Sequence, residues 1–170
     1  MMGQDRHFNL HDLIPGGKTQ SHFVPRNLKQ LQWCGDTYLY VKGDSMMSGE
    51  STKTVKLAFT RRQLNEALTA AGAQTVGSMP FFSVPYKDQP VLAFNAKRHR
   101  FHYNFAENRI VNTYDLNGSW ENFDFCPANG YLAFTEGDNL KILSPDNAVS
   151  IVTNETAKGI VCGKSVHQNE

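Results

Sequence analysis

Residues 121–153 alternate short apolar runs with tight-turn signals, and this alternation constrains the fold more than any other feature of the sequence. The turn signals lie at 127–130, 136–139 and 144–147, where Gly, Asn and Asp supply the positive φ angles that tight turns need. The runs between them predict four strands, at Glu121–Phe125, Tyr131–Thr135, Leu140–Leu143 and Val149–Thr153. Four antiparallel strands in about 33 residues have the size of one β-propeller blade.

Similar units precede this one. Comparable first-strand positions are Trp33, Val84 and Phe125, at spacings of 51 and 41 residues, and repeats of about 40–50 residues are typical of propeller blades. We therefore predict an all-β fold: a partial propeller of about three four-stranded antiparallel blades plus the start of a fourth. The predicted parts are an N-terminal arm at 1–30, blade-like units at about 31–80, 81–118 and 119–156, and a beginning unit at 157–170.

One short inserted helix is predicted at about residues 61–71. Thr60 and Gln63 have capping-box spacing, the apolar residues between 64 and 71 form one stripe, and Gly72 is placed to end the helix. Asp44–Thr52 is polar and rich in small residues, so we expect a flexible loop there.

Composition and charge exclude several classes of function. The net charge of +1 gives no electrostatic case for binding nucleic acid or an anionic membrane. No apolar run approaches the ~20 residues of a membrane span, and the first ten residues lack the apolar segment of a signal peptide. The three cysteines have no metal-ligand spacing, so we expect buried apolar side chains.

No motif in the sequence predicts catalysis, a metal site or a cofactor. Gly43–Met47 lacks the second glycine of a serine-hydrolase elbow. Gly163-Lys164-Ser165 resembles the end of a phosphate-binding loop, but the first glycine of that motif is missing at Lys158. His99 and His102 are three apart on a predicted strand, so they face opposite sides and cannot chelate one ion together.

Several stretches resemble a known family. Gly159–Glu170, GIVCGKSVHQNE, closely resembles a segment of bacterial dipeptidyl peptidase IV enzymes, which belong to the prolyl oligopeptidase family. Asp12–Gly17, Phe23–Gln32, Asp124–Gly130 and Asn139–Leu143 look like the N-terminal region of the same family, in collinear order.

The resemblance implies that the chain is the first part of an eight-bladed propeller that precedes a C-terminal α/β-hydrolase domain. Such enzymes are periplasmic or cell-surface serine exopeptidases that release N-terminal dipeptides, preferably after proline. The catalytic serine, aspartate and histidine would lie beyond residue 170, so this chain would shape and gate the substrate cavity without being catalytic. Its expected partners are a peptide with a free N-terminus and the hydrolase domain.

The resemblance also implies one substrate-binding residue, Glu170. A glutamate of the family's propeller pairs with the free α-amino group of the substrate and so anchors it at a fixed distance from the nucleophile. The family pattern has two adjacent glutamates, whereas Asn169 precedes Glu170 here. A relative that releases tripeptides therefore stays open.

Two other hypotheses remain open. A non-catalytic propeller-type module could bind protein partners through blade edges and loops such as Asp44–Thr52, and a glycan-processing propeller is a weaker alternative. Three blades would also leave unpaired edge strands at both ends, which predicts either homo-oligomers that pair these edges or a fragment that closes on itself with altered ends.

Overall fold

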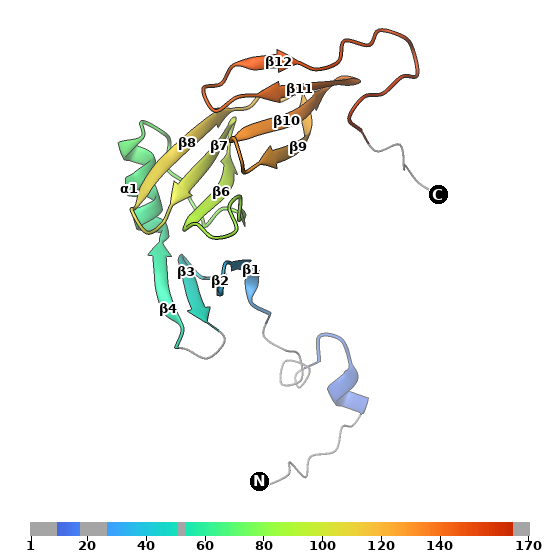
Figure 1. Ribbon diagram of the computed structural model, residues 1–170. Coiled ribbons are helices and arrows are strands. Elements are labelled where there is room, and N and C mark those ends of the chain that lie inside the picture. The colour runs from blue at the N-terminus through green and yellow to red at the C-terminus, as the bar shows by residue number, and fades with distance from the viewer. Residues whose placement is uncertain (1–9, 18–26, 51–53, 165–170) are drawn as a thin grey trace.

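The structure, a computed structural model, describes residues 10–17, 27–50 and 54–164. Its strands form three four-stranded antiparallel sheets, in which strands that follow one another in sequence lie side by side. Figure 1 shows the three sheets along an open arc, with the second sheet between the first and the third. The predicted all-β architecture of successive blade-like units is confirmed.

The strands are short and nearly even in length. The first sheet contains β1 (Lys29–Cys34), β2 (Thr37–Lys42), β3 (Ser45–Glu50) and β4 (Lys56–Thr60). The second contains β5 (Phe82–Ser83), β6 (Val91–Ala96), β7 (His99–Asn104) and β8 (Arg109–Asp115). The third contains β9 (Trp120–Cys126), β10 (Tyr131–Glu136), β11 (Asn139–Leu143) and β12 (Val149–Ile151). A short 3-10 helix, η1 (Leu10–Leu13), precedes them.

β3 corrects the prediction of a flexible loop at 44–52. Ser45–Glu50 pairs with β2 along its whole length and also with β4. Gly49 lies opposite Tyr38 of β2, and a Cβ atom at Gly49 would be only 2.5 Å from the ring of Tyr38. The tyrosine ring fills this space, so the strand needs a residue without a side chain there. The glycine that makes this sequence resemble a loop is therefore explained by the ring of Tyr38 on the neighbouring strand.

The helix α1 (Arg61–Ala70) begins and ends as predicted. At its N-terminus, the backbone N–H of Thr60 donates to the side chain of Gln63, and the N–H of Gln63 donates to the hydroxyl of Thr60. At its C-terminus, Gly72 has a φ of +72° and Ala73 donates to the carbonyl oxygen of Leu68 at 2.8 Å. These bonds are those of a Schellman motif, which satisfies the last carbonyl groups of the helix.

The larger core lies between the first and second sheets and includes the buried face of α1. Phe59 is almost fully buried, and the rings of Phe82, Tyr103 and Phe105 lie 5.0–6.0 Å from its own. Edge-to-face and offset pairs at such distances are favourable. The buried members of this core are Leu39, Val41, Met46, Phe59, Leu64, Ala67, Leu68, Phe82, Leu92, Phe94, Phe101 and Tyr103.

A smaller core joins the second and third sheets. Its four buried members are Tyr114, Leu132, Phe134 and Leu143. Trp120 stacks on Phe134 with ring centroids 3.9 Å apart. The contact of the third sheet with its neighbour therefore contains fewer fully buried apolar residues than that of the first sheet.

Four side-chain amides pair with the backbone as a strand would, and we call them amide clips. Asn147, in the turn between β11 and β12, accepts from the N–H of Asp115 at 2.8 Å and donates to the carbonyl oxygen of Thr113 at 3.1 Å. It thereby ties the third sheet to β8, the edge strand of the second. The other clips are Gln30 on residues 80 and 82, Asn65 on residue 76, and Asn139 on residue 155.

The described end of the chain, residues 157–164, contains no strand and packs on the third sheet. The N–H of Cys162 donates to the carbonyl oxygen of Asp138 at 2.9 Å, and Gly163 lies against Leu140 and Thr135. The start of a fourth unit and the domain boundaries stay predictions, because residues 165–170 lie outside the described part.

All three cysteines are free thiols. The expectation that they are buried is wrong for Cys126, which is exposed because it ends β9 at a surface turn. Cys34 and Cys162 are half-buried. The thiol of Cys34 donates to the carbonyl oxygen of Gln89 at 3.1 Å, which links the first sheet to the loop between β5 and β6.

Candidate functional site

The predicted substrate-binding residues Glu170 and Asn169 lie outside the described residues, so their role stays a prediction. The two histidines of β7 diverge as expected. His99 is half-exposed, and its Nδ1 lies 2.8 Å from a carboxylate oxygen of Asp115, whereas His102 is fully buried. Within the described ranges, no group of three or more His, Cys, Asp or Glu side chains is arranged to hold a metal ion.

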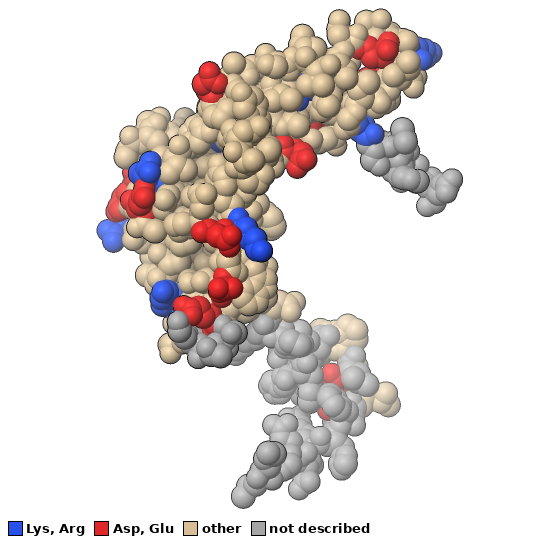
Figure 2. All heavy atoms as spheres, viewed as in Figure 1, with Lys and Arg blue, Asp and Glu red and all other residues tan. Residues whose placement is uncertain are grey.

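Charge is dispersed over the described surface. Figure 2 shows acidic and basic side chains interspersed on the visible face, so this face has no extended patch of one sign. None of the helices in the described ranges has the length and apolar character needed to cross a membrane.

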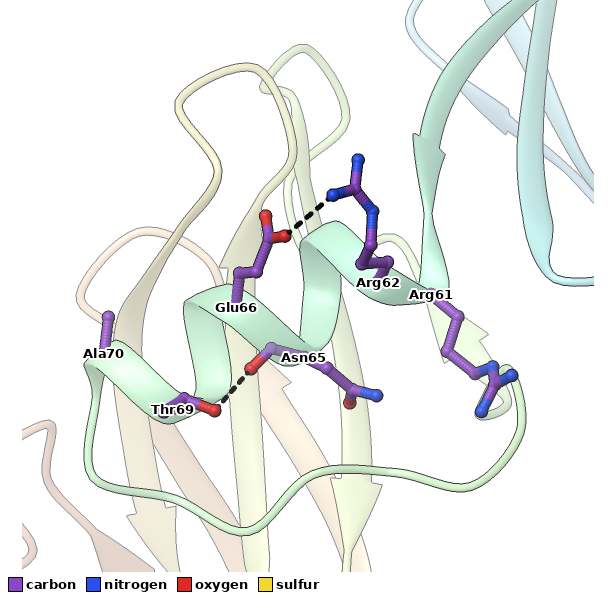
Figure 3. Close-up of a pocket in the computed structure, with 6 residues that line it drawn as sticks. All are labelled: Arg61, Arg62, Asn65, Glu66, Thr69 and Ala70. Carbon is purple, nitrogen blue, oxygen red and sulfur yellow. Dashed lines mark hydrogen bonds and ion pairs between the residues drawn. The ribbon is translucent and has the colours of Figure 1, made fainter.

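The exposed face of α1 forms a shallow depression whose charged groups are paired with one another (Figure 3). Arg62 forms an ion pair with Glu66 at 3.5 Å, and Arg61 binds the carboxylate of Asp44 at 2.7 Å. Asn65 is engaged as an amide clip. These side chains stabilise the helix and its connection to the sheet, and they leave no free acid, base or nucleophile to act on a ligand.

A second depression, of about 640 Å³, lies between the second and third sheets. Four connections meet there: the loop between β5 and β6, the turn from β7 to β8, the turn from β9 to β10, and the turn from β11 to β12. We call it the inter-sheet groove. Antiparallel meanders bring alternate turns to the same end of each sheet, so adjacent blades present these turns side by side.

Two polar side chains of the inter-sheet groove already use their oxygen atoms as hydrogen-bond acceptors. The Oδ1 atom of Asn104 accepts from two backbone N–H groups at 3.0 Å, and that of Asn129 accepts from the N–H of Tyr131 at 3.1 Å. Because a backbone N–H needs an oxygen acceptor, these bonds fix the orientation of both amides. The Nδ2 groups of Asn104 and Asn129 make no hydrogen bond within the described residues, and none of the lining residues carries a carboxylate.

The walls of the groove are held together at Tyr114. Its hydroxyl donates to the carbonyl oxygen of Gly130 at 2.6 Å, which ties the β9–β10 turn to β8. Gly130 has a φ of +74°, and a Cβ atom there would lie 3.1 Å from Pro145. Burial raises the pKa of Tyr114, so its hydroxyl stays protonated and continues to donate.

His102 lies buried behind the wall of the groove. Its ring is surrounded by those of Tyr86, Tyr114 and Phe125, with centroids 5.8, 5.3 and 4.8 Å away. Both ring nitrogens lack a hydrogen-bond partner within the described residues. Burial, assisted by the charge of Arg100, lowers the pKa of His102 to about 4. The imidazole is therefore neutral near pH 7 and out of reach of a substrate.

The sequence did not reveal this groove, because its residues come from strand β8 and from connections that are far apart in sequence. The turn residues Asn129 and Gly130 were identified, but only as turn formers. The local signal was the Asn-rich character of the turns, which does not distinguish an amide that closes a turn from one that also offers a donor.

Comparison with known proteins supports one relationship. No family model matches the chain. The crystal structure of a putative dipeptidyl aminopeptidase IV from Bacteroides ovatus matches 93% of this chain with 33% sequence identity and a TM-score of 0.72. The match covers 21% of that protein, so the chain spans about a fifth of its relative's length. Two structures of Hsv2 from Kluyveromyces lactis match 80% of the chain at 12% identity and a TM-score of 0.38, a similarity too low to support a shared fold.

Sequence and structure thus agree over nearly the whole chain. The order of three four-stranded sheets and one helix is consistent with partial propeller blades. The predicted resemblance to the N-terminal propeller region of dipeptidyl peptidase IV proteins is confirmed.

Proposed function

We propose that this chain is the N-terminal propeller part of a dipeptidyl peptidase IV-like serine exopeptidase. The parent enzyme would release N-terminal dipeptides, preferably after proline, in the periplasm or at the cell surface. The observation that carries this proposal is the match over 93% of the chain, at 33% identity and a TM-score of 0.72, to a putative dipeptidyl aminopeptidase IV.

Within the parent enzyme, the chain itself would shape and gate the substrate cavity. The open arc of three sheets (Figure 1) supports this role, because further blades could continue it into a ring around a cavity. The described histidines do not suggest catalysis: His102 is buried without a polar partner, and His99 is bound to exposed Asp115. The peptide-bond chemistry would come from the α/β-hydrolase domain.

Glu170 is the residue we propose to contact substrate. Its carboxylate would pair with the α-ammonium group of the peptide and so fix the distance from the N-terminus to the scissile bond. Asn169 at the neighbouring position departs from the family's pair of glutamates. Release of tripeptides is therefore the alternative outcome for the same site.

The test is hydrolysis of a Gly-Pro chromogenic substrate by the 170-residue chain and by a longer chain that includes the hydrolase domain. We expect activity in the longer chain alone. In that chain, Glu170→Gln should lower kcat/KM by about tenfold or more, because a charge-assisted bond to the substrate is lost.

Two controls separate this role from a structural one. Exposed Glu121→Gln should leave kcat/KM unchanged, and an N-acetylated substrate, which has no ammonium group, should not distinguish Glu170→Gln from the unsubstituted enzyme. Activity of the 170-residue chain by itself, or inactivity of the longer chain on both Gly-Pro and tripeptide substrates, would contradict the proposal.

A non-catalytic interaction module is the second candidate function. Large apolar side chains of the first sheet are exposed, with Leu31, Trp33 and Leu57 each more than half accessible, and apolar surface of this kind favours contact with another protein. An inactive longer chain that forms a stable dimer or captures a partner through this sheet would favour the module. Homo-oligomers paired at β1 or β12 would be detected as a concentration-dependent mass by light scattering.

A further inference from the structure

We propose that a groove between the first and second sheets binds a sugar, a neutral ligand rich in hydroxyl groups. The groove has a volume of about 710 Å³, within the range of roughly 300–1,000 Å³ that is typical of ligand pockets. The β1–β2 turn, β3 and β4 line it on one side, and the β5–β6 loop and the β7–β8 turn line it on the other. We call it the Ser48 groove. This inference does not depend on the proposed peptidase function, because it rests only on the groups that line the groove.

A buried hydroxyl group without a partner is the first argument. Ser48 of β3 is 5% exposed and lines the groove. Its hydroxyl makes no hydrogen bond to another described residue. A buried polar group that stays unbonded is unfavourable, so this position favours a ligand that bonds it. Because a hydroxyl both donates and accepts, a ligand hydroxyl matches it in both roles.

Lys56 adds donors beside this hydroxyl. It is the direct partner of Ser48 in the pairing of β3 with β4, so the two side chains project from the same face of the first sheet. Lys56 lines the groove and forms no ion pair with any residue in the described ranges. Its ammonium group therefore keeps its three donors for the oxygen atoms of a ligand.

Two carboxylates supply the acceptors. The Oδ1 atom of Asp88, in the β5–β6 loop, lies 3.5 Å from the position that a Cβ atom would take at Gly35, in the β1–β2 turn. Asp36 of the same turn also lines the groove, and neither carboxylate is hydrogen-bonded or ion-paired within the described part of the chain. A ligand hydroxyl that donates to a carboxylate forms a charge-assisted bond, which is stronger than a neutral one.

The thiol in the groove is not a nucleophile. Burial, assisted by the charge of Asp88, raises the pKa of Cys34. The thiol therefore stays protonated and donates to the carbonyl oxygen of Gln89 at 3.1 Å. The arrangement supports binding and not covalent chemistry.

The mixture of charges selects a neutral ligand. Lys56 repels a cation, whereas Asp36 and Asp88 repel an anion, and all three are exposed, so an ion pair with a ligand would add little affinity. Sugar hydroxyls accept from an ammonium group and donate to a carboxylate equally well. Half-buried Phe105 and Pro90 add apolar surface for the C–H groups of a sugar ring.

An NMR titration of the 170-residue chain tests the proposal. The probes are maltose, cellobiose and lactose, with the zwitterion alanine and a capped neutral dipeptide as ligands of other chemistry. We expect at least one disaccharide to shift the amide resonances of Gly35, Ser48 and Asp88 saturably, with a Kd below about 10 mM. Ser48→Ala should weaken this binding by about fivefold or more, because it removes only the hydroxyl. Asp88→Asn should weaken it by about threefold or more, because the charge-assisted bond is lost.

Ser150→Ala and Asp124→Asn are the matched controls. Both residues are exposed on strands of the third sheet and lie outside the groove, so their substitution should leave the Kd unchanged. The proposal is overturned if no disaccharide binds, if alanine or the capped dipeptide shifts the same amides with a lower Kd, or if the control substitutions weaken binding as much as Ser48→Ala and Asp88→Asn do. Circular dichroism melts of each variant exclude unfolding as the cause.

Discussion

The two faces of the second sheet are chemically different. In β7, Phe101 and Tyr103 belong to the apolar core shared with the first sheet, whereas the alternate residue His102 contacts aromatic rings on the side of the third sheet. Arg100 also lies on that side, and it bonds the hydroxyl of Ser83 at 3.3 Å. One six-residue strand thus presents Phe101 and Tyr103 to the first sheet, and Arg100 and His102 to the opposite side, as the alternation of side chains in a strand allows.

The two contacts therefore stabilise the molecule in different ways. Twelve buried residues join the first and second sheets with α1, against four at the other contact, so apolar burial makes the first two sheets and the helix one stable unit. The third sheet is joined through this smaller core, through the ring of Phe125 against those of His102 and Tyr114, and through oriented polar bonds such as that of Asn147. Hydrogen bonds add little net stability but fix geometry. We infer that the third sheet is the part that opens first.

The largest expected effect comes from Phe59→Ala. Phe59 is 1% exposed and contacts three aromatic rings, so we expect a loss of about 3–5 kcal/mol in the free energy of unfolding, measured by urea denaturation. Hydrogen exchange should show reduced protection in both the first and second sheets.

Phe134→Ala is the matched substitution in the smaller core. Phe134 is fully buried and stacked on Trp120, and its loss should reduce hydrogen-exchange protection mainly in β9–β12. If Phe134→Ala instead lowers protection in all three sheets to the same extent as Phe59→Ala, the division into a stable unit and a more weakly held sheet is wrong.

Acid should weaken the contact between the second and third sheets through His102. The pKa of His102 is lowered from 6.5 to about 4 by burial and by Arg100. Between these values the unfolded chain binds a proton that the folded chain does not, so stability is complete above about pH 6.5 and falls as the pH decreases towards 4. The loss is about 3 kcal/mol. Arg100 and the two tyrosines that face the imidazole offer no negative charge to stabilise its protonated form.

Urea denaturation at pH 7.5 and pH 5 measures this effect. His102→Phe removes the titration and should reduce the difference between the two pH values, whereas substitution of exposed His99 by Gln should retain it. An unchanged difference in His102→Phe would assign the acid sensitivity to other groups. Hydrogen exchange at pH 5 should place the loosened amides on β8 and β9–β12.

The smallest of these effects should follow Asn147→Asp. The aspartate keeps an oxygen for the N–H of Asp115, but it places a second oxygen against the carbonyl oxygen of Thr113. We expect a loss of about 1–3 kcal/mol, because a hydrogen bond is replaced by contact between two acceptors. The amide of Asp115 should exchange faster by NMR, and Asn117→Asp, which lies in a surface turn, serves as the control. Equal effects of both substitutions would show that the clip adds nothing specific.

The strand order and the helix could be predicted from the sequence because their signals are local. Turn residues such as Gly130 and Gly137 mark the chain reversals, and Thr60, Gln63 and Gly72 mark the ends of α1. Neighbouring strands in a meander pair with one another, so a correct list of strands nearly determines the topology.

The rest could not be predicted because it depends on neighbours that are distant in sequence. The sequence of β3 predicts a loop, because its glycine, Gly49, is explained only by the ring of Tyr38 on the neighbouring strand. The side chain of Gln30 binds backbone atoms at least 50 residues away in sequence, and that of Asn147 binds backbone atoms at least 32 residues away. Likewise, only the structure shows that the side-chain oxygens of Asn104 and Asn129, in the inter-sheet groove, are already bonded to backbone N–H groups.

The amide clips have a consequence for which substitutions the chain tolerates. A clip recognises only backbone atoms, so the clip itself excludes only proline at Val76, Phe82, Asp115 and Glu155, where a backbone N–H must donate. Phe82 is restricted further by its burial in the larger core, whereas Asp115 is exposed. The clip residue itself is restricted in the opposite way, because only a side-chain amide places a donor and an acceptor side by side in one plane, as a backbone peptide group does. In a saturation library, Asn147 and Asp115 would therefore form an asymmetric pair: the exposed position 115 accepts almost any residue except proline, and position 147 accepts almost none.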